Sequence, residues 1–465
     1  MAHRAQDGGR PPAEVDVVVL GLGPAGRGAA LDLAEAGLEV VGIDKHLVGG
    51  ECPFYGCTPT KMMVRAAELL AEARRVGGMA GTSTVEPSWV PVAERIADEA
   101  TDDWDDQEAV DALTAAGVWV VRGHGRLAGS RRVAVGDETF RARRGVLLGT
   151  GTEPGVPPID GLARTPYWTN RDIVKVTDLP ETLIVIGGGA IGVELCQVLA
   201  RFGVTVTLLE AADRILAQGE PEASALITEV FGSEGIRVLA GADIERVDYA
   251  DGQFTVAVDG HRMSAEKLLV TAGRKNNLGD VGLETVGLDP DLDVIETDSQ
   301  MRAADGLWAA GDITGRGAYT HIAHYQAEIA TRAIIDCPDG PAADYRAVPN
   351  VTFTDPEVGS VGMTEERARD DGRTVRTGAA DLSQSPRGWV HSRGNQGFVK
   401  VVEDADDQVL VGATVAGPMG GELLAYLTLA IHARVPTATL ESMIYAFPTF
   451  HETIKSALAD LQPSS

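Results

Sequence analysis

The hydrophobic pattern of the chain repeats a strand–helix–strand order twice. Val15–Leu20 and Val40–Ile43 are short apolar runs rich in β-branched residues, which is typical of strands buried in a parallel sheet. Arg27–Ala36, between them, is rich in alanine and leucine and is predicted to be a helix. The same order returns in a second set of segments, at Thr182–Ile186, Val193–Phe202 and Val204–Leu209. The pattern predicts an α/β fold built on two βαβ units.

Further apolar runs predict additional strands. Val118–Val121 and Arg132–Val135 are expected to form a small sheet, and Gly145–Gly151 and Leu268–Gly273 are expected to be strands. From Val348 onward the pattern is strand-rich and then helical, which indicates a separate C-terminal α+β region. Its predicted strands and its amphipathic helix are Asn350–Thr354, Gly397–Val402, Leu410–Val415 and Gly421–Ala433.

Glycine-rich turns join strand to helix in both βαβ units. Gly21–Gly26 reads GLGPAG and Gly187–Gly192 reads GGGAIG, so both fit the pattern GxGxxG. Such glycines allow a tight turn and a close approach to a pyrophosphate, and the helix N-terminus offers free N–H groups to the phosphates. The next strands end in Asp44 and Glu210, whose carboxylates can accept hydrogen bonds from ribose hydroxyls. We therefore predict two dinucleotide sites, formed by Gly21, Gly23, Pro24, Ala25, Gly26 and Asp44, and by Gly187, Gly189, Ile191, Gly192 and Glu210.

Two cysteines follow the first unit in Gly49–Lys61, which reads GGECPFYGCTPTK. Cys52 and Cys57 are five residues apart, and in an ideal helix their Cα atoms would be roughly 8–9 Å apart. A disulfide tolerates up to about 7 Å, so the pair can join only if the helix start is bent, as Pro53 and Gly56 would allow. The positive helix end is expected to lower the thiol pKa values. The alternatives are two inert thiols or half of a zinc site, which would need a second Cys or His pair nearby; no metal site is predicted.

The composition excludes several partners. A net charge of −28 disfavours binding to nucleic acid or to anionic membranes, and it fits a solubility role better than an adaptation to salt. Four cysteines in 465 residues are typical of a cytoplasmic chain, and no apolar run reaches membrane-spanning length. Residues 1–13 are expected to form a disordered leader.

The two glycine loops and the cysteine stretch together resemble the class I flavoprotein (pyridine nucleotide) disulfide oxidoreductases, over nearly the whole chain. The resemblance implies two Rossmann-like domains, with FAD on the first loop and NAD(P)H on the second. Since Glu210 should repel a 2′-phosphate, NADH is favoured over NADPH. A homodimer with active sites shared across its interface and a small-molecule substrate are also implied. The implied segments are FAD-binding 14–155, NAD(P)H-binding 156–281, FAD-binding 282–346 and dimerisation 347–465.

The resemblance also assigns roles to single residues. Cys57 is the charge-transfer sulfur over the flavin, Cys52 is the outer interchange sulfur, and Lys61 lies near flavin N5. Glu194 pairs with this lysine, although it could instead be only a first-turn helix acid. The remaining positions implied to approach the cofactors are Gly125, Thr150, Gly151, Gly273 and Asp312. His321 and His324 are expected to be packing residues rather than bases.

The chain departs from the family at one catalytic position. The family carries His-Pro-Thr-x-x-Glu near the C-terminus, where the histidine exchanges protons with the interchange thiol and the glutamate orients it. This chain has Phe447 in place of the histidine and keeps Glu452. Phenylalanine cannot transfer a proton, and such help is typically worth ~10²–10⁴-fold, so ordinary disulfide reduction should be slow.

Three readings of this departure stay open. His451 could serve as the base. The enzyme could use its cysteines without a base, as in family members with Phe at this position such as 2-oxopropyl-coenzyme M oxidoreductase/carboxylase, which cleaves a thioether but has histidine at the glutamate position. The acceptor could instead be a quinone or dye that takes electrons from reduced flavin. Mercuric reductases carry a C-terminal cysteine pair, whereas no cysteine follows Cys337 here.

Overall fold

The computed structural model describes residues 10–336 and 342–463. The chain divides into two compact units. The first comprises the described parts of Met1–Pro59, Glu94–Gly155 and Arg274–Asp344, and the second comprises those of Thr60–Ala93, Val156–Gly273 and Tyr345–Ser465. Part of the predicted leader, and Cys337, lie outside the described residues.

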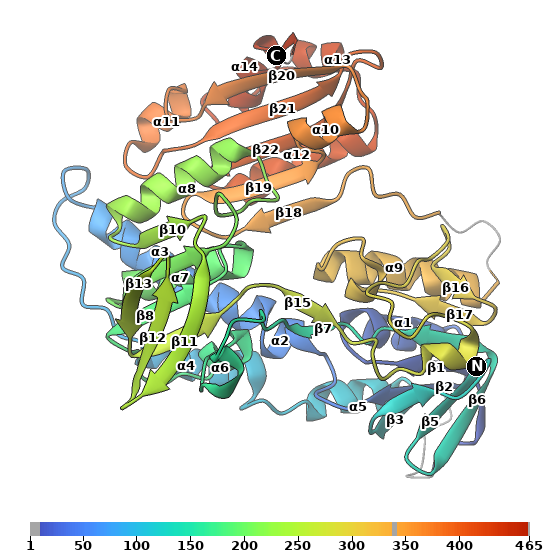
Figure 1. Ribbon diagram of the computed structural model, residues 1–465. Helices are drawn as coiled ribbons and strands as arrows, with labels where there is room; N and C mark the ends of the chain where they lie inside the picture. Colours follow the sequence, from blue (N-terminus) through green and yellow to red (C-terminus); the bar gives the residue numbers. More distant parts are fainter. Residues whose placement is uncertain (1–9, 337–341, 464–465) are drawn as a thin grey trace. The chain divides into compact units, whose positions relative to one another are not determined.

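One sheet organises the first unit (Figure 1). Its strands are β1 (Glu14–Leu20), β2 (Val40–Asp44), β3 (Val118–Arg122), β4 (Gly125–Leu127), β5 (Arg132–Val135), β6 (Glu138–Leu148), β16 (Arg302–Ala304) and β17 (Leu307–Ala309). The order along the main path is β16-β17-β6-β1-β2-β3, and β1 runs parallel to both β2 and β6. The carboxyl end of β1 therefore lies where the strand order changes direction, which is where α/β sheets bind ligands.

The expectation of a small separate sheet at Val118–Val121 and Arg132–Val135 is wrong. Val118 pairs in parallel with Val40, so β3 extends the main sheet beside β2. The helix α5 (Gln107–Ala115) directly precedes β3 and supplies a crossover of the kind that parallel strands need. Arg132–Val135 pairs with β4 and β6 in antiparallel fashion and belongs to the same sheet.

The helices of the first unit begin close to the glycine loop and the cysteines. α1 (Pro24–Glu35) follows β1 directly and packs against α9 (Thr320–Ile334), while α2 (Glu51–Phe54) is one turn long. A π-helix, Ile96–Thr101, packs against α2. β7 (Thr152–Pro154) pairs with β15 (Arg274–Asn276). The core under the sheet is filled by β-branched and leucine side chains, including Val15, Val18, Val41, Ile43, Val146 and Leu148.

The second unit contains the second βαβ pattern. Its parallel strands are β8 (Thr182–Ile186), β9 (Thr205–Glu210), β10 (Arg237–Ala240) and β14 (Lys267–Val270), in the order β10-β9-β8-β14. An antiparallel meander of β11 (Ile244–Ala250), β12 (Gln253–Val258) and β13 (His261–Ala265) packs beside them. The helices are α3 (Cys57–Arg75), whose first three residues belong to the first unit, α4 (Val90–Arg95), α6 (Asn170–Ile173), α7 (Ala190–Arg201) and α8 (Pro221–Ser233). The predicted second βαβ unit is therefore confirmed.

The C-terminal part of the second unit is an antiparallel sheet with helices, drawn in orange and red in Figure 1. Its order is β18-β19-β22-β21-β20-β23, formed by β18 (Pro349–Thr352), β19 (Glu357–Gly362), β20 (Val375–Asp381), β21 (Phe398–Asp404), β22 (Val409–Gly417) and β23 (Gln462–Pro463). The predicted helix is present as α12 (Gly420–His432), which packs on β19 and β22. The other helices are α10 (Glu365–Asp370), α11 (Pro386–His391), α13 (Thr437–Ser442) and α14 (Glu452–Ala459). Among the described helices, none has both the length and the apolar character that a bilayer span requires.

Candidate active site

The two glycine loops fold in the same way. Gly21 and Gly187 have φ values of +91° and +109°, which side chains rarely allow. A Cβ at Gly26 would lie 1.8 Å from the carbonyl oxygen of Gly21, and one at Gly192 would lie 1.9 Å from that of Gly187. The middle glycines differ from these, because among the described residues no atom beyond the chain neighbours lies within 4 Å of the position of a Cβ at Gly23 or Gly189. Each loop therefore closes tightly at its ends and leaves open space where a phosphate chain would approach.

Each loop is tied to the acid at the end of the following strand. Asp44 accepts hydrogen bonds from the backbone N–H of Leu22 (2.6 Å) and of His46 (2.7 Å). Glu210 accepts hydrogen bonds from the corresponding N–H groups of Gly188 (2.5 Å) and Ala212 (2.7 Å). Both predicted carboxylates are thus fixed against their loops at the carboxyl ends of β2 and β9.

The residues around the first loop offer polar atoms suited to a dinucleotide. The Oγ1 atom of Thr150 and the Nε atom of Arg27 are buried, and neither has a hydrogen-bond partner within the part of the chain that the structure describes. Asp312 follows β17 and accepts a hydrogen bond from Thr152 Oγ1 at 2.6 Å. Together with the open position at Gly23, these groups fit a bound FAD. Packing also explains why residue 125 is a glycine, because a Cβ there would lie 2.5 Å from Leu20 Cδ1.

The predicted bend between the cysteines is confirmed. α2 ends at Phe54, and α3 begins at Cys57. Cys52 is half-buried and Cys57 is exposed, and both are thiols in the structure. A hydrogen bond to Cys57 is the main cause that raises the pKa of Cys52, and burial raises it further. The expectation of a lowered thiol pKa is therefore wrong for Cys52, because the hydrogen bond to Cys57 and burial both raise the pKa of this thiol.

Thr320 lies beside this pair and was not predicted from the sequence. Its Oγ1 atom is 3.4 Å from the Sγ atom of Cys57, and it also hydrogen-bonds to Cys52, which lowers the pKa of that thiol in part. Thr320 is the first residue of α9 and is 263 positions from Cys57, so no local pattern points to it. His321, its neighbour, stacks on the ring of Tyr319 at 5.2 Å between centroids.

Lys61 and Glu194, which were predicted to pair, do so. The Nζ atom of Lys61 is 2.6 Å from Glu194 Oε2, and the side chains are 37% and 5% exposed. The second carboxylate oxygen accepts a hydrogen bond from the backbone N–H of Phe353 at 2.8 Å. The Phe353 ring also lies under the ammonium group, 4.8 Å from its centroid. Lys61 is four residues, or about one helical turn, after Cys57 on α3. The same helix therefore carries both the ammonium group and the cysteine.

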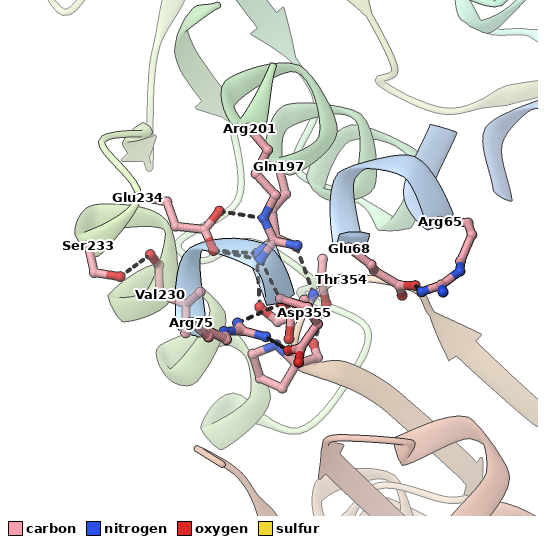
Figure 2. Close-up of polar contacts among 12 residues, drawn as sticks. Arg65, Glu68, Arg75, Gln197, Arg201, Val230, Ser233, Glu234, Thr354 and Asp355 are labelled. Atoms are coloured by element: carbon pink, nitrogen blue, oxygen red, sulfur yellow. Dashed lines mark hydrogen bonds and ion pairs between the residues drawn. The ribbon is translucent and has the colours of Figure 1, made fainter. Parts of the chain in front are cut away.

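A partly buried ionic cluster links the helices that carry this pair (Figure 2). Asp355 Oδ2 accepts from Arg75 at the end of α3 (2.7 Å) and from Arg201 at the end of α7 (2.8 Å). Arg201 also forms two hydrogen bonds with Glu234, at 2.7 and 3.0 Å. Gln197 exchanges hydrogen bonds with the backbone of Asp355 in both directions. Phe353 contacts Glu194, and Asp355, two residues later, is bonded to the C-terminal ends of α3 and α7.

The C-terminal motif has a different character. Phe447 is 71% exposed, and Ile444, three residues earlier, is 98% exposed. His451 is the N-cap residue of α14, and its Nε2 atom is 3.5 Å from Thr449 Oγ1. The Oε2 atom of Glu452 is buried and has no hydrogen-bond partner among the described residues. The motif thus retains an acceptor without the histidine donor that the family pattern would supply.

Gly151 and Gly273 both have positive φ values, +61° and +127°, and neither has an atom near the position of a Cβ. Ile191 lies in the first turn of α7. Within the described ranges, no group of three or more His, Cys, Asp or Glu side chains is arranged to hold a metal ion.

Comparisons with known proteins agree on one family. The family described as "Pyridine nucleotide-disulphide oxidoreductase" matches residues 15–327, and its dimerisation domain matches residues 348–458. The chain is 34% identical over 453 residues to a mercuric reductase from Acidithiobacillus ferrooxidans, covering 96% of this chain and 82% of that one. It is 33% identical over 464 residues to a dihydrolipoyl dehydrogenase from Halobacterium salinarum, covering 95% of each. The HOCl-induced flavoprotein disulfide reductase RclA from Escherichia coli is a similar solved structure, with a TM-score of 0.83 and 25% identity over 96% of this chain and 99% of that one.

Proposed function

The chain belongs to the pyridine nucleotide-disulphide oxidoreductase family, and on this premise we propose that it passes electrons from NAD(P)H through FAD to Cys52 and Cys57 without a histidine base. The observation that carries the proposal is a contrast within the chain. A hydrogen bond joins Cys52 to Cys57, and an ion pair joins Lys61 to Glu194, whereas Phe447 stands where the family has its proton donor and the buried Oε2 atom of Glu452 has no hydrogen-bond partner among the described residues. The substrate class that follows is a thiol, disulfide or thioether compound of small size.

FAD would be held by the first glycine loop and by the groups around it. The first turn of α1, Asp44, Thr150 and Asp312 supply the hydrogen-bonding atoms, and Gly23 leaves the space. When bound, FAD accepts a hydride from the nicotinamide and delivers an electron pair to a disulfide. The second loop and Glu210 would hold the nicotinamide dinucleotide in the same manner, and the carboxylate favours NADH, since it would repel a 2′-phosphate.

The hydrogen bond between the thiols supports a division of roles. Reduction of a Cys52–Cys57 disulfide breaks the S–S bond and takes up two electrons and one proton. Because the pKa of Cys52 is raised by its hydrogen bond to Cys57, that proton stays on Cys52 and leaves Cys57 as the thiolate. Thr320 stabilises the thiolate by donating to it. Cys57 is therefore assigned as the charge-transfer sulfur and Cys52 as the sulfur that meets the substrate.

Lys61 and Glu194 are assigned to the flavin side. The Glu194 carboxylate is almost fully buried and accepts from both Lys61 and the Phe353 backbone, so it fixes the ammonium group in one position. A fixed positive charge next to the site of hydride arrival stabilises negative charge as it develops there.

A homodimer is part of the proposal. The dimerisation domain matches residues 348–458, and exposed apolar side chains gather in the same part of the sequence. They include Trp389, Met419, Leu429, Ile444 and Phe447. Such side chains favour association with a second copy, which would bring Phe447 into the shared site that the family resemblance implies. The cytoplasmic location stays a prediction from cysteine usage.

Two alternatives follow from the same motif. A quinone or dye reductase would need the intact Lys61–Glu194 pair and no base at position 447, which this chain satisfies. An ordinary disulfide reductase would need His451 as its base. Among the described residues, this ring contacts Thr449 and the ring of Tyr445, and no hydrogen bond between His451 and Glu452 is present.

The test is NADH oxidation by the purified dimer against a panel of small disulfides and quinones, with Cys52→Ser in parallel. We expect slow turnover of disulfides that is lost in Cys52→Ser. Fast disulfide turnover in the wild type would contradict the role given to Phe447. Turnover of quinones alone, with wild type and variant equal, would show that the cysteine pair is idle and would favour the first alternative.

A further inference from the structure

A short left-handed turn lies next to the redox loop. Asp102, Asp103 and Trp104 have φ values of +46°, +51° and +60°, a conformation that non-glycine residues rarely adopt singly and almost never in a row. The turn follows the π-helix Ile96–Thr101, which is itself an irregularity often found at functional sites. We propose that the segment 102–106, here termed the clasp, holds the loop between Val48 and Cys57 in the bent form and thereby sets the reduction potential of the cysteine pair.

Trp104 acts at the bend itself. Its indole N–H donates to the carbonyl oxygen of Phe54 at 3.0 Å. In an uninterrupted helix this carbonyl would accept from the residue four positions later, but the interruption at Tyr55 and Gly56 removes that partner. Trp104 therefore supplies a donor that the bend requires, and the bend is what brings the thiols of Cys52 and Cys57 within hydrogen-bonding reach.

Asp106 holds the other end of the loop. Its carboxylate accepts from the backbone N–H of Val48 at 2.5 Å and forms two contacts of 2.6 Å with Arg122. Arg122 also donates to the carbonyl oxygen of His46 at 2.6 Å. The clasp is therefore hydrogen-bonded to the loop at two points: at Val48, before the glycine pair, and at Phe54, the last residue of α2. The π-helix also packs against α2.

The direction of the effect follows from this geometry. Hydrogen bonds that favour the bend keep the two thiols close together and so raise their effective concentration. A higher effective concentration shifts the equilibrium from the dithiol toward the disulfide. Loss of the Trp104 bond should make the pair easier to reduce. The inference rests on the proposed function only in taking Cys52 and Cys57 as the redox pair.

The test compares Trp104→Phe with Trp89→Phe in the FAD-loaded protein. Trp89 is a matched control, because its indole N–H also donates to a backbone carbonyl, that of Val176, at 2.7 Å. Each protein is equilibrated in dithiothreitol buffers, quenched by alkylation and assayed by mass spectrometry of the peptide with both cysteines. Because the Trp104 bond also forms when both cysteines are thiols, the full energy of one hydrogen bond sets the upper limit of the effect. We expect the disulfide-to-dithiol ratio to fall in Trp104→Phe by up to about fivefold, which corresponds to about 20 mV. Trp89→Phe should match the wild type.

The outcomes separate the two claims. An unchanged ratio in Trp104→Phe, or an equal shift in both variants, overturns the clasp while leaving the proposed function intact. A wild-type chain that never forms the Cys52–Cys57 disulfide overturns both. If Trp104→Phe does not fold, Asp106→Asn is the second test, because it weakens the hydrogen bond from the Val48 N–H. A fall in the disulfide-to-dithiol ratio that is smaller than the one expected for Trp104→Phe supports the clasp, and an unchanged ratio overturns it.

Discussion

The redox loop and the C-terminal motif are the two regions that the family pattern assigns to chemistry, and they differ in how they are built. Around Cys52 and Cys57, contacts come from distant parts of the same unit: Thr320 reaches Cys57, and Trp104 reaches Phe54. In the C-terminal motif, the Phe447 side chain is mostly exposed, and the buried Oε2 atom of Glu452 has no hydrogen-bond partner in residues 10–336 and 342–463. This difference supports the proposal that the chain transfers electrons to its cysteines without a histidine that transfers protons.

The largest effect on the rate of disulfide reduction is expected when a proton donor is placed at position 447. Phe447→His places an imidazole where the family has one, and Glu452 already offers an acceptor. We expect reduction of small disulfides by NADH to rise ~10²-fold, within the range of general acid–base catalysis. The matched control is Phe447→Leu, which keeps the position apolar. Equal rates in the two variants would contradict our reading of position 447.

Removing the ammonium group on the flavin side should have the next largest effect. Lys61→Met leaves Glu194 buried without its ionic partner, and loss of such a charged hydrogen bond, about 1.5–3 kcal/mol, predicts flavin reduction slower by ~10- to 100-fold. Rapid mixing with NADH measures this rate. Lys267→Met is the matched control, because Lys267 also lies over an aromatic ring, that of Trp168. Similar rates in both variants would remove Lys61 from the site.

A smaller effect should appear in the reactivity of Cys52. The hydrogen bond to Cys57 holds the pKa of Cys52 above its ordinary value, so its thiol stays protonated to higher pH. Cys57→Ala removes the largest cause, and the pH profile of Cys52 alkylation should move to lower pH. Cys196→Ala is the control. Burial alone raises the pKa of the Cys196 thiol, so its removal should leave the alkylation profile of Cys52 unchanged. A profile for Cys52 that does not move in Cys57→Ala would contradict the shared proton.

The smallest effect is expected at His451. His451→Asn removes a ring whose Nε2 atom is only at the limit of hydrogen bonding to Thr449, so disulfide reduction should change by less than about twofold. Steady-state rates across pH 6–9 measure this change. A drop of more than about tenfold would identify His451 as the missing base and would remove the contrast between the two regions.

The sequence predicted the parts of this molecule that depend on local pattern. The two βαβ units, their glycine loops and the break between Cys52 and Cys57 follow from apolar runs, glycines and helix geometry. The placement of β3 was missed because an apolar run shows that a strand is buried but does not show which strand it pairs with. Pairing depends on the crossover before the strand, here α5.

The side chains that support the site were beyond sequence reasoning. Thr320, Phe353 and Trp104 are 263, 159 and 50 positions from the groups they contact. Threonine, phenylalanine and tryptophan carry no motif at those positions, so only the fold reveals their roles. Lys61 and Glu194 are also distant, and a family pattern was needed to pair them.

An anaerobic titration of the wild-type dimer with NADH tests the central claim most directly. If electrons reach the cysteine pair without a histidine base, one equivalent of NADH should produce the long-wavelength absorption of a Cys57 thiolate against oxidised flavin. That absorption should then decay slowly after a small disulfide is added. Absence of the absorption would contradict the role of the cysteines, and its immediate loss on addition of the disulfide would contradict the claim that proton transfer has been removed.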